Sequence, residues 1–355
     1  MGSQAFWKRV GLALALLILL VVPVVVRVNY YLHLLLLTFM YAAMATSWNI
    51  MGGYAGYISL GHSVFFGVGG YISALLAIHY GLSPLLTAPL AGLGAAIVGV
   101  FIGYTSLRTR GRAFVIVTIA LLYIFQLIAL NLRGLTRGVL GLQLPLPPWD
   151  VDIIKVPFYY AMLLIMCAAI YTSYRVRNSK FGLGLMAIRE DEDKAEAVGI
   201  NTSLYKILAF AISVYFVGVA GGVYGYYQTY IDPLLMFDIV VGVRMILMTI
   251  LGGRGTLWGP VLGAFIALPA QDFILFRFGS SSLHLTFFGL FLLLLVLFLP
   301  QGILPSLREG LRYARRWRAT LGFRISDFGF RISDWGSPKS EIRNPKWRGR
   351  EEEDA

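Results

Sequence analysis

The feature that most constrains this chain is a stretch from Val28 to Leu107, about 80 residues, that contains no Lys, Arg, Asp or Glu. A membrane-spanning helix needs roughly 20 apolar residues, so this stretch can supply three or four crossings. The 355 residues are 58% apolar and 14% charged, which excludes a pair of water-soluble domains. A β-barrel would show alternating polar and apolar residues instead. The sequence therefore predicts an all-α, polytopic integral membrane helical bundle.

Successive apolar runs predict about ten transmembrane helices. The runs cover 10–26, 28–50, 63–80, 84–106, 113–132, 156–174, 204–228, 239–252, 257–275 and 283–299. The first resembles a signal peptide but lacks a small-residue cleavage site, so we interpret it as a retained helix. Nine helices is the alternative, because 239–252 is brief and Arg244 within it would cost about 2.5–3.5 kcal/mol on insertion.

The net charge of +12 follows the predicted topology. Twelve of the 30 basic residues lie after Pro305, and the ten-helix topology puts 12 of the others inside and 6 at or near the outside. We therefore expect both termini in the cytoplasm. A nucleic-acid groove would gather these residues on one face, so no nucleic acid is expected. Residues 1–305 are predicted to form the membrane domain, and 306–355 a basic, disordered cytoplasmic tail.

Two glycine-rich segments occupy comparable positions in the predicted topology. One is MGGYAGYISLGHSVFFG, from Met51 to Gly67, and the other is LGGRGTLWGPVLGAF, from Leu251 to Phe265. Glycine-interrupted segments at matching points of two halves indicate broken helices around a transport pathway. The alternative is that the glycines serve tight helix crossings. We keep both interpretations, with a degenerate internal repeat as the hypothesis.

Enzymatic chemistry is not expected. Gly61-His62-Ser63 suggests a serine hydrolase, but no carboxylate supports a histidine base near Ser63. The single Cys167 and four scattered histidines predict neither a disulfide nor a metal site. Nucleotide-binding motifs are also absent from the sequence, so this chain is expected to bind no cofactor. If ATP drives the protein, another chain binds it.

The longest charged loop, residues 180–206, is predicted to be cytoplasmic and to contain a short helix. A charged run from Arg189 to Glu196 is flanked by apolar patches, and Gly199 follows as a helix stop. Asn201, Thr202 and Ser203 offer N-caps for the next membrane helix. The loop alone is compatible with a solvated elbow or with a helix that docks into a partner's groove.

Four motifs in order give the chain a resemblance to a known family. They are Gly56-Tyr57-Ile58-Ser59-Leu60-Gly61-His62, the Arg110-Gly111 and Thr118 region, Ala187-Ile188-Arg189-Glu190 through Asn201 with Tyr205-Lys206, and Leu251-Gly252-Gly253 through Gly263. Over roughly residues 40–305 the sequence resembles LivM-type permease subunits of branched-chain amino acid ABC transporters.

This resemblance implies that residues 180–206 are the coupling segment that seats on an ATPase. Glu190 to Gly199 would form the docking helix, and the residues implied in coupling are Arg189, Glu190, Asp191, Ala195, Ala197 and Gly199. The implied partners are a LivH-type second permease, two ATP-binding cassette subunits that hold ATP and Mg, and an extracytoplasmic solute-binding protein. The implied location is the plasma membrane of a bacterial or archaeal cell.

Some residues depart from the family pattern, and two alternatives for function stay open. Thr136 to Gly141 stands where family members often have Thr-x-Gly-x-Asn-Gly in the external loop, so Leu140 replaces a polar side chain, and Arg244 stands where an acidic residue is common. Related permeases serve urea and short amides, which is the alternative substrate. An ion-coupled secondary carrier is the alternative class, but the helices through residue 107 contain no acid for it. The residues expected to line the pathway are Gly53, Ser59, His62, Ser63 and Thr249.

Overall fold

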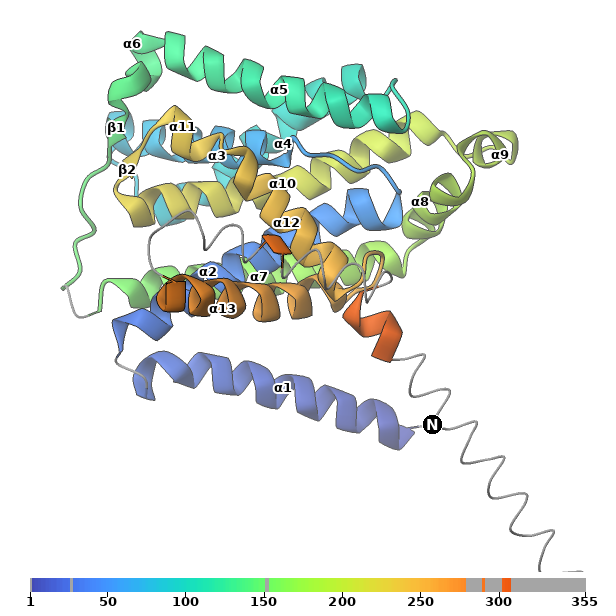
Figure 1. Ribbon diagram of the computed structural model, residues 1–355, viewed down its shortest axis with the longest axis horizontal. Helices are drawn as coiled ribbons and strands as arrows, with labels where there is room; N and C mark the ends of the chain where they lie inside the picture. The colour runs from blue at the N-terminus through green and yellow to red at the C-terminus, as the bar shows by residue number, and fades with distance from the viewer. Residues whose placement is uncertain (1, 26–27, 151–152, 279–288, 291–301, 308–355) are drawn as a thin grey trace, which may run out of the picture. The chain divides into compact units, whose positions relative to one another are not determined.

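The computed structural model describes residues 2–25, 28–150, 153–278, 289–290 and 302–307 (Figure 1). The chain divides into two units, Met1–Ser306 and Leu307–Ala355. The first unit contains α1 (Gly2–Val25), α2 (Asn29–Asn49), the π-helical turn η1 (Ile50–Tyr54), α3 (His62–Tyr80), α4 (Pro84–Ser106), α5 (Arg112–Asn131), α6 (Arg133–Thr136), the 3₁₀ turn η2 (Gly138–Leu140), β1 (Leu142–Gln143), α7 (Lys155–Arg177), α8 (Lys180–Glu190), α9 (Glu192–Ala197), α10 (Thr202–Gln228), β2 (Tyr230–Ile231), α11 (Pro233–Met236), α12 (Ile239–Gly252) and α13 (Gly259–Phe278).

Eight helical segments in the described part are long and apolar enough to cross a membrane. Seven of the predicted runs from 28–50 to 257–275 agree with α2, α3, α4, α5, α7, α10 and α13 to within a few residues at each end. The brief run 239–252, which was the reason for the nine-helix alternative, coincides with α12. Helix α1 begins before the predicted run 10–26, and the run 283–299 lies almost wholly outside the described residues. The predicted polytopic helical architecture is confirmed, while the total of ten spans stays a prediction.

Helices pack closely at the centre because small residues meet there. Helix α10 packs mainly against α3 and α4, and α2 packs against α7 and α13. A Cβ atom on Gly69 of α3 would lie 2.1 Å from the carbonyl oxygen of Gly218, and one on Gly221 of α10 would lie 2.0 Å from that of Phe66. Backbones at such distances require glycine, as membrane bundles often show.

Polar side chains begin several helices at the two ends of the bundle. Asn201 accepts a hydrogen bond from the Leu204 amide, which confirms one predicted N-cap of α10. Asp232 caps α11 towards the opposite end, and Asp238 caps α12, whose first turn packs beside the start of α3. Strands β1 and β2 pair antiparallel at that same end, with Leu142 opposite Ile231 (Figure 1). The segment predicted to couple to an ATPase, α8 with α9, lies at the other end, and we call it the coupling segment (Figure 1).

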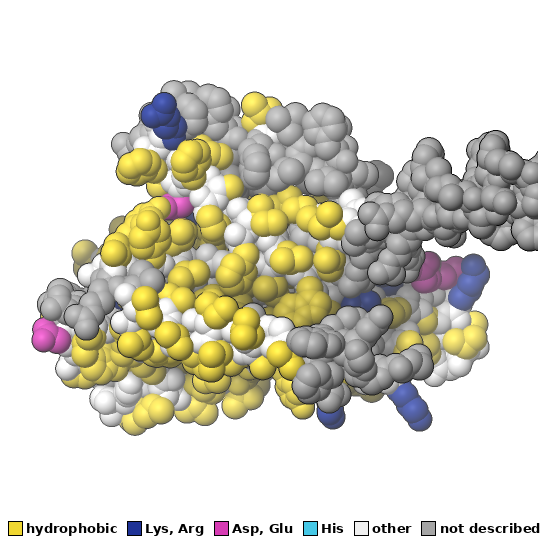
Figure 2. Space-filling view, turned by 90° about the horizontal axis from the view of Figure 1, so that it is seen from below, with side chains coloured by type: hydrophobic (Ala, Val, Ile, Leu, Met, Phe, Trp, Pro, Cys, Tyr) yellow, Lys and Arg dark blue, Asp and Glu magenta, His cyan; other side chains and the backbone are white. Residues whose placement is uncertain are grey.

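The outer surface is mostly apolar. Figure 2 shows hydrophobic side chains over the middle of the described face, with charged side chains towards its two ends. Large apolar side chains such as Phe101, Ile116 and Leu164 are each about 70% exposed. A water-soluble protein could not expose so much apolar surface, so this surface faces lipid.

Candidate functional site

The coupling segment contains two helices instead of the single one expected. The predicted docking helix, Glu190 to Gly199, is replaced by α8, which ends at Glu190, and by the shorter α9, Glu192–Ala197. Asp191 between them has extended backbone and accepts a hydrogen bond from the Lys194 amide at 3.1 Å. Aspartate at this position is a preferred N-cap, so it ends one helix and starts the next. Gly199 has a φ of +89°, which suits the predicted stop.

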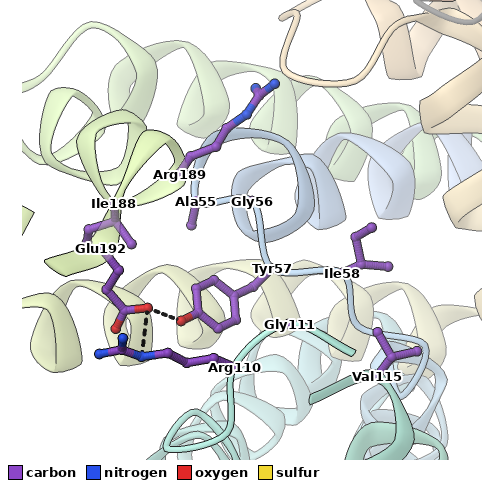
Figure 3. Close-up of a pocket in the computed structure, with 10 residues that line it drawn as sticks. All are labelled: Ala55, Gly56, Tyr57, Ile58, Arg110, Gly111, Val115, Ile188, Arg189 and Glu192. Carbon is purple, nitrogen blue, oxygen red and sulfur yellow. Dashed lines mark hydrogen bonds and ion pairs between the residues drawn. The ribbon is translucent and has the colours of Figure 1, made fainter. Parts of the chain in front are cut away.

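The first residue of α9, Glu192, ties this helix to three other parts of the bundle. Its carboxylate lies 2.6 Å from the Lys206 ammonium of α10 and 3.5 Å from the Arg110 guanidinium of the loop between α4 and α5. The Tyr57 hydroxyl, from the loop after η1, donates a hydrogen bond to it (Figure 3). The Glu192 and Lys206 side chains are 11% and 5% exposed. We call these four residues the Glu192 cluster.

Lys206 connects the cluster to the end of α4. Its ammonium donates to the Leu107 carbonyl oxygen at 3.2 Å and to the Tyr57 hydroxyl at 3.3 Å. The same ammonium lies 5.1 Å from the centre of the Tyr57 ring, within the range of a cation–π interaction. A buried ammonium needs such partners, because desolvation of an unpaired charge is costly. A displacement of α9 therefore acts directly on α4, α10 and the loop after η1.

Electrostatics favour the charged form of Glu192. Burial raises the pKa of its carboxyl, but hydrogen bonds from Lys206 and Tyr57 and the charges of Lys206 and Arg110 outweigh burial, so the pKa lies below its usual range. Burial and the hydrogen bond to Glu192 raise the pKa of the Tyr57 hydroxyl, which keeps it a donor. Near the surface, the hydrogen bond to Asp193 raises the pKa of Arg110.

The lowered pKa of Glu192 predicts how α9 responds to pH. A carboxyl with a depressed pKa stabilises the folded state fully above its unfolded pKa, near 4.5, and loses that contribution as pH falls through the folded value. We expect the amides of α9 to keep their protection from hydrogen exchange, corrected for intrinsic rates, from pH 8 down to about 5. Protection should fall below about pH 4. Loss of protection already between pH 7 and 5 would contradict this role of Glu192.

The two glycine-rich segments lie against each other beside the coupling segment. The Asn49 side chain accepts a hydrogen bond from the Gly255 amide at 2.8 Å and donates one to the Thr256 carbonyl oxygen at 2.9 Å. A Cβ on Gly53 would lie 2.9 Å from the Gly255 nitrogen. Arg189 of α8 donates a hydrogen bond to the Gly53 carbonyl oxygen at 2.8 Å. One predicted coupling residue thus contacts one predicted pathway residue.

Both interpretations of the glycines find support in these segments. Each glycine pair ends a helix, is followed by non-helical residues and precedes a new helix, α3 or α13, as the repeat hypothesis predicts. Gly252 also serves a tight crossing, since its Cβ would lie 1.6 Å from the Gly259 carbonyl oxygen. Most residues of both segments are buried or half-buried, while Ile58, Arg254 and Leu262 are exposed.

A pocket of about 350 Å³ opens between the loop after η1, the loop between α4 and α5, and the coupling segment (Figure 3). Its lining includes Tyr57, Ile58, Arg110, Arg189 and Glu192. The Arg110 and Glu192 side chains point towards each other across the pocket, while that of Arg189 points away from this pair (Figure 3). This pocket therefore separates the coupling segment from the loop after η1 except where the cluster and Arg189 bridge them.

The other coupling residues differ in exposure. Ala195 is 3% exposed and faces the bundle, whereas Glu190, Ala197 and Gly199 are exposed. Two apolar side chains of the segment are exposed as well. Val198, directly after α9, is 77% exposed, and Leu183 of α8 is 65% exposed.

The predicted pathway residues are all buried. Ser59, His62, Ser63 and Thr249 have no exposed surface, and Gly53 is also buried. The Thr249 hydroxyl donates to the Ala45 and Met245 carbonyl oxygens, and His62 pairs with Ser213 at 2.7 Å. The hydroxyls of Ser59 and Ser63 and Nδ1 of His62 have no partner within the described residues. Only Ser59 borders a small internal cavity, and none of the five lines the larger pocket.

Sequence reasoning missed the Glu192 cluster as a unit. In the sequence, Tyr57, Arg110 and Lys206 stand out only as members of the motifs that carry the resemblance. Glu192 stands out only as part of a charged run. One signal was available: Lys206 is the single charged residue at the start of the apolar run 204–228. A lysine that enters an apolar helix needs a partner, and the acidic run 190–196 is the nearest source along the chain.

Comparison with known proteins places this architecture in a family. Residues 30–298 match the family described as the permease component of branched-chain amino acid transport systems. The chain is 28% identical to the high-affinity branched-chain amino acid transport system permease protein LivM of Escherichia coli K12, over 78% of this chain and 70% of LivM. It is 31% identical to BraD of Pseudomonas aeruginosa over 36% of this chain and 41% of BraD, and 30% identical to LivH of Escherichia coli K12 over the same shares.

No solved structure gives a significant match to this chain. The family assignment therefore depends on sequence, and it agrees with the apolar helices described above. Homologues named as permeases are transporter components and not enzymes. This multi-pass membrane protein belongs to the family of permease components of branched-chain amino acid transport systems.

Proposed function

We propose that this chain is the LivM-type membrane subunit of an ATP-driven importer for branched-chain amino acids in a bacterial or archaeal plasma membrane. The Glu192 cluster carries the proposal. It fastens a short helix outside the membrane to α4, α10 and the loop after η1, as a permease driven by a separate ATPase requires. LivM relatives named as branched-chain amino acid permeases support the substrate.

The proposed partners follow from this role. A LivH-type permease would form the second half of the pathway, two ATPase subunits would bind ATP and Mg, and a solute-binding protein outside would deliver the substrate. This chain itself would bind no cofactor. The coupling segment and 12 of the 18 basic residues before the tail share one predicted side, which supports ten spans with both termini in the cytoplasm.

Movement would pass through the chain by direct contacts. Closure of the ATPase pair around ATP would displace α8 and α9. Glu192 would then pull on α10 through Lys206, and Arg189 would pull on the glycine-rich segments through Gly53. Packed helices respond to such a pull by shifting between discrete arrangements, here inward-open and outward-open states. Asn49 joins the two glycine-rich segments, so they would move as one body.

The exposed face of α9 offers a direct test of docking. Val198→Asp places a charge on a side chain that is 77% exposed, so we expect little effect on the fold. In proteoliposomes holding all subunits, ATP-dependent leucine uptake should fall about tenfold or more, because a carboxylate would enter an apolar contact. Gly199 is a poorer choice, since any side chain is strained at its φ of +89°.

Val139→Asp is the matched control. Val139 is 73% exposed in η2, at the opposite end of the bundle from α9. The Val139→Asp variant should leave the amount of ATPase that co-purifies with the permease unchanged, whereas Val198→Asp should reduce that amount. Equal uptake by Val198→Asp and wild type would contradict docking through α9. Uptake of urea without leucine would overturn the substrate, and transport without any ATPase would overturn the class.

A further inference from the structure

Helix α12 carries an arginine within an apolar membrane span. Arg244 lies five residues after the start of α12 and eight before its end at Gly252, so about 8 Å of helix separates it from the outer end. Its side chain is half-buried, and its guanidinium donates a hydrogen bond to the Tyr41 hydroxyl of α2 at 3.4 Å. Within the described residues it forms no ion pair.

The chain offers Arg244 few carboxylates. No Asp or Glu precedes Asp150, and between Ile239 and Arg308 the sequence contains only Asp272. Asp272 accepts a hydrogen bond from Tyr30, and Asp238 is occupied as the N-cap of α12, where it accepts from the Val240 amide at 2.9 Å. A charged residue in a membrane span without a built-in counter-charge indicates a functional site.

One tyrosine, Tyr41 of α2, contacts Arg244 directly. Two further tyrosines lie on α10, where the ring centre of Tyr224 is 6.4 Å from that of Tyr227. Tyr227 pairs with His33 at 2.7 Å. Aromatic faces attract ammonium groups, and a guanidinium binds carboxylates in a bidentate manner. This juxtaposition provides complementary groups for both charges of an amino acid.

Arg244 also lies near residues expected to line the pathway. A Cβ on Gly242, two residues before it, would lie 3.3 Å from the Ser63 hydroxyl. Thr249 follows five residues later on the same helix. From the start of α12 the order is therefore Gly242 beside Ser63, then Arg244, then Thr249.

We propose that Arg244 binds the carboxylate of a zwitterionic substrate as it crosses the membrane, an inference that rests on the proposed importer function. The residue then contributes to specificity. Leucine, valine and isoleucine carry the carboxylate that the guanidinium binds, whereas urea and short amides lack it. Within the described residues Arg244 makes no hydrogen bond or ion pair with α8 or α9, so it acts on transport and not on docking of the ATPases.

The test uses the complete complex in proteoliposomes. Arg244→Gln should lower leucine uptake, at saturating loaded binding protein, by roughly 30-fold or more, the factor for a truncated charge pair. ATP hydrolysis stimulated by the binding protein should stay within about twofold of wild type. Arg244→Lys, which keeps the charge but not the bidentate geometry, should retain a measurable part of the uptake. Arg277→Gln, at the exposed end of α13, is the matched control for loss of one positive charge.

Each outcome decides a separate point. Leucine uptake by Arg244→Gln within about twofold of wild type would overturn this inference and leave the importer function intact. If Arg244→Gln failed to assemble with the second permease, Arg244 would pair with a carboxylate of that subunit and not with the substrate. This result would also overturn the inference. A wild-type complex that transports urea and not leucine would overturn both the inference and the proposed substrate.

Discussion

Glu192→Gln should destabilise the protein by about 3–5 kcal/mol and abolish ATP-dependent uptake. The substitution leaves the Lys206 ammonium, 5% exposed, without the carboxylate 2.6 Å away. Its remaining partners, the Leu107 carbonyl oxygen and the Tyr57 hydroxyl, are neutral. A buried ammonium without a carboxylate partner must gain water, which requires the contact between α9 and α10 to open. Thermal unfolding of the purified complex in detergent, together with leucine uptake, measures both effects.

A double variant separates stability from coupling. Glu192→Gln with Lys206→Met removes both charges, so it should recover most of the lost stability, as replacement of a buried ion pair usually does. Uptake should stay lost, because α9 would no longer be fastened to α10. Lys194→Met is the control, since the Lys194–Asp191 pair lies at the surface and should contribute little to stability. A double variant with normal uptake would show that coupling does not pass through this pair.

Gly263→Ala should prevent stable folding of the α12–α13 pair. Its Cβ would lie 1.8 Å from the Met248 carbonyl oxygen, and a Cβ on Gly252, across the same crossing, would lie 1.6 Å from the Gly259 carbonyl oxygen. Backbone atoms cannot yield as a flexible side chain does, so we expect a cost above the roughly 1–3 kcal/mol usual for overpacking. The yield of folded protein after detergent extraction, followed by size-exclusion chromatography, measures the effect.

Gly94→Ala in α4 is the matched control for Gly263→Ala. Its Cβ would approach the Cδ1 atom of Ile72 to 2.5 Å, at the far end of a side chain that can change rotamer. This substitution should therefore be tolerated, and it should gain helix propensity. If Gly263→Ala folded as well as Gly94→Ala, the crossing of α12 and α13 would have to be looser than the backbone distances indicate.

The membrane helices could be predicted because their signal is local. Each apolar run ends at charged or helix-breaking residues, and Pro84, for example, begins α4 where the run 84–106 begins. The break at Asp191 was missed because a charged run of helix-forming residues hides one capping side chain. In α12 the total apolar content outweighed the cost of Arg244. Local propensity therefore determined where the helices end. A single polar residue changed a helix end only where its side chain could cap the helix, as at Asp191.

The candidate site was predicted only in part because its contacts join distant residues. The resemblance pointed to the coupling segment, but no pattern within residues 180–206 shows that Glu192 faces inward and Val198 outward. Tyr57 and Glu192 are 135 residues apart in sequence. Hydrophobic periodicity cannot indicate such a pair, since it describes the face of one helix and not its neighbour. The contact between Arg189 and Gly53 escaped prediction for the same reason.

The long sequence separation within the Glu192 cluster also orders events during synthesis. Lys206 follows Tyr57 by 149 residues, and at a ribosomal rate of about 5–20 residues per second it emerges roughly 7 to 30 s later. During this interval the Leu107 carbonyl oxygen and the Tyr57 hydroxyl lack the hydrogen bonds that the Lys206 ammonium donates in the folded protein. In the proposed importer, the surface that receives the ATPase would be completed only once α10 arrives, so a nascent chain would not present that surface before α10 is in place.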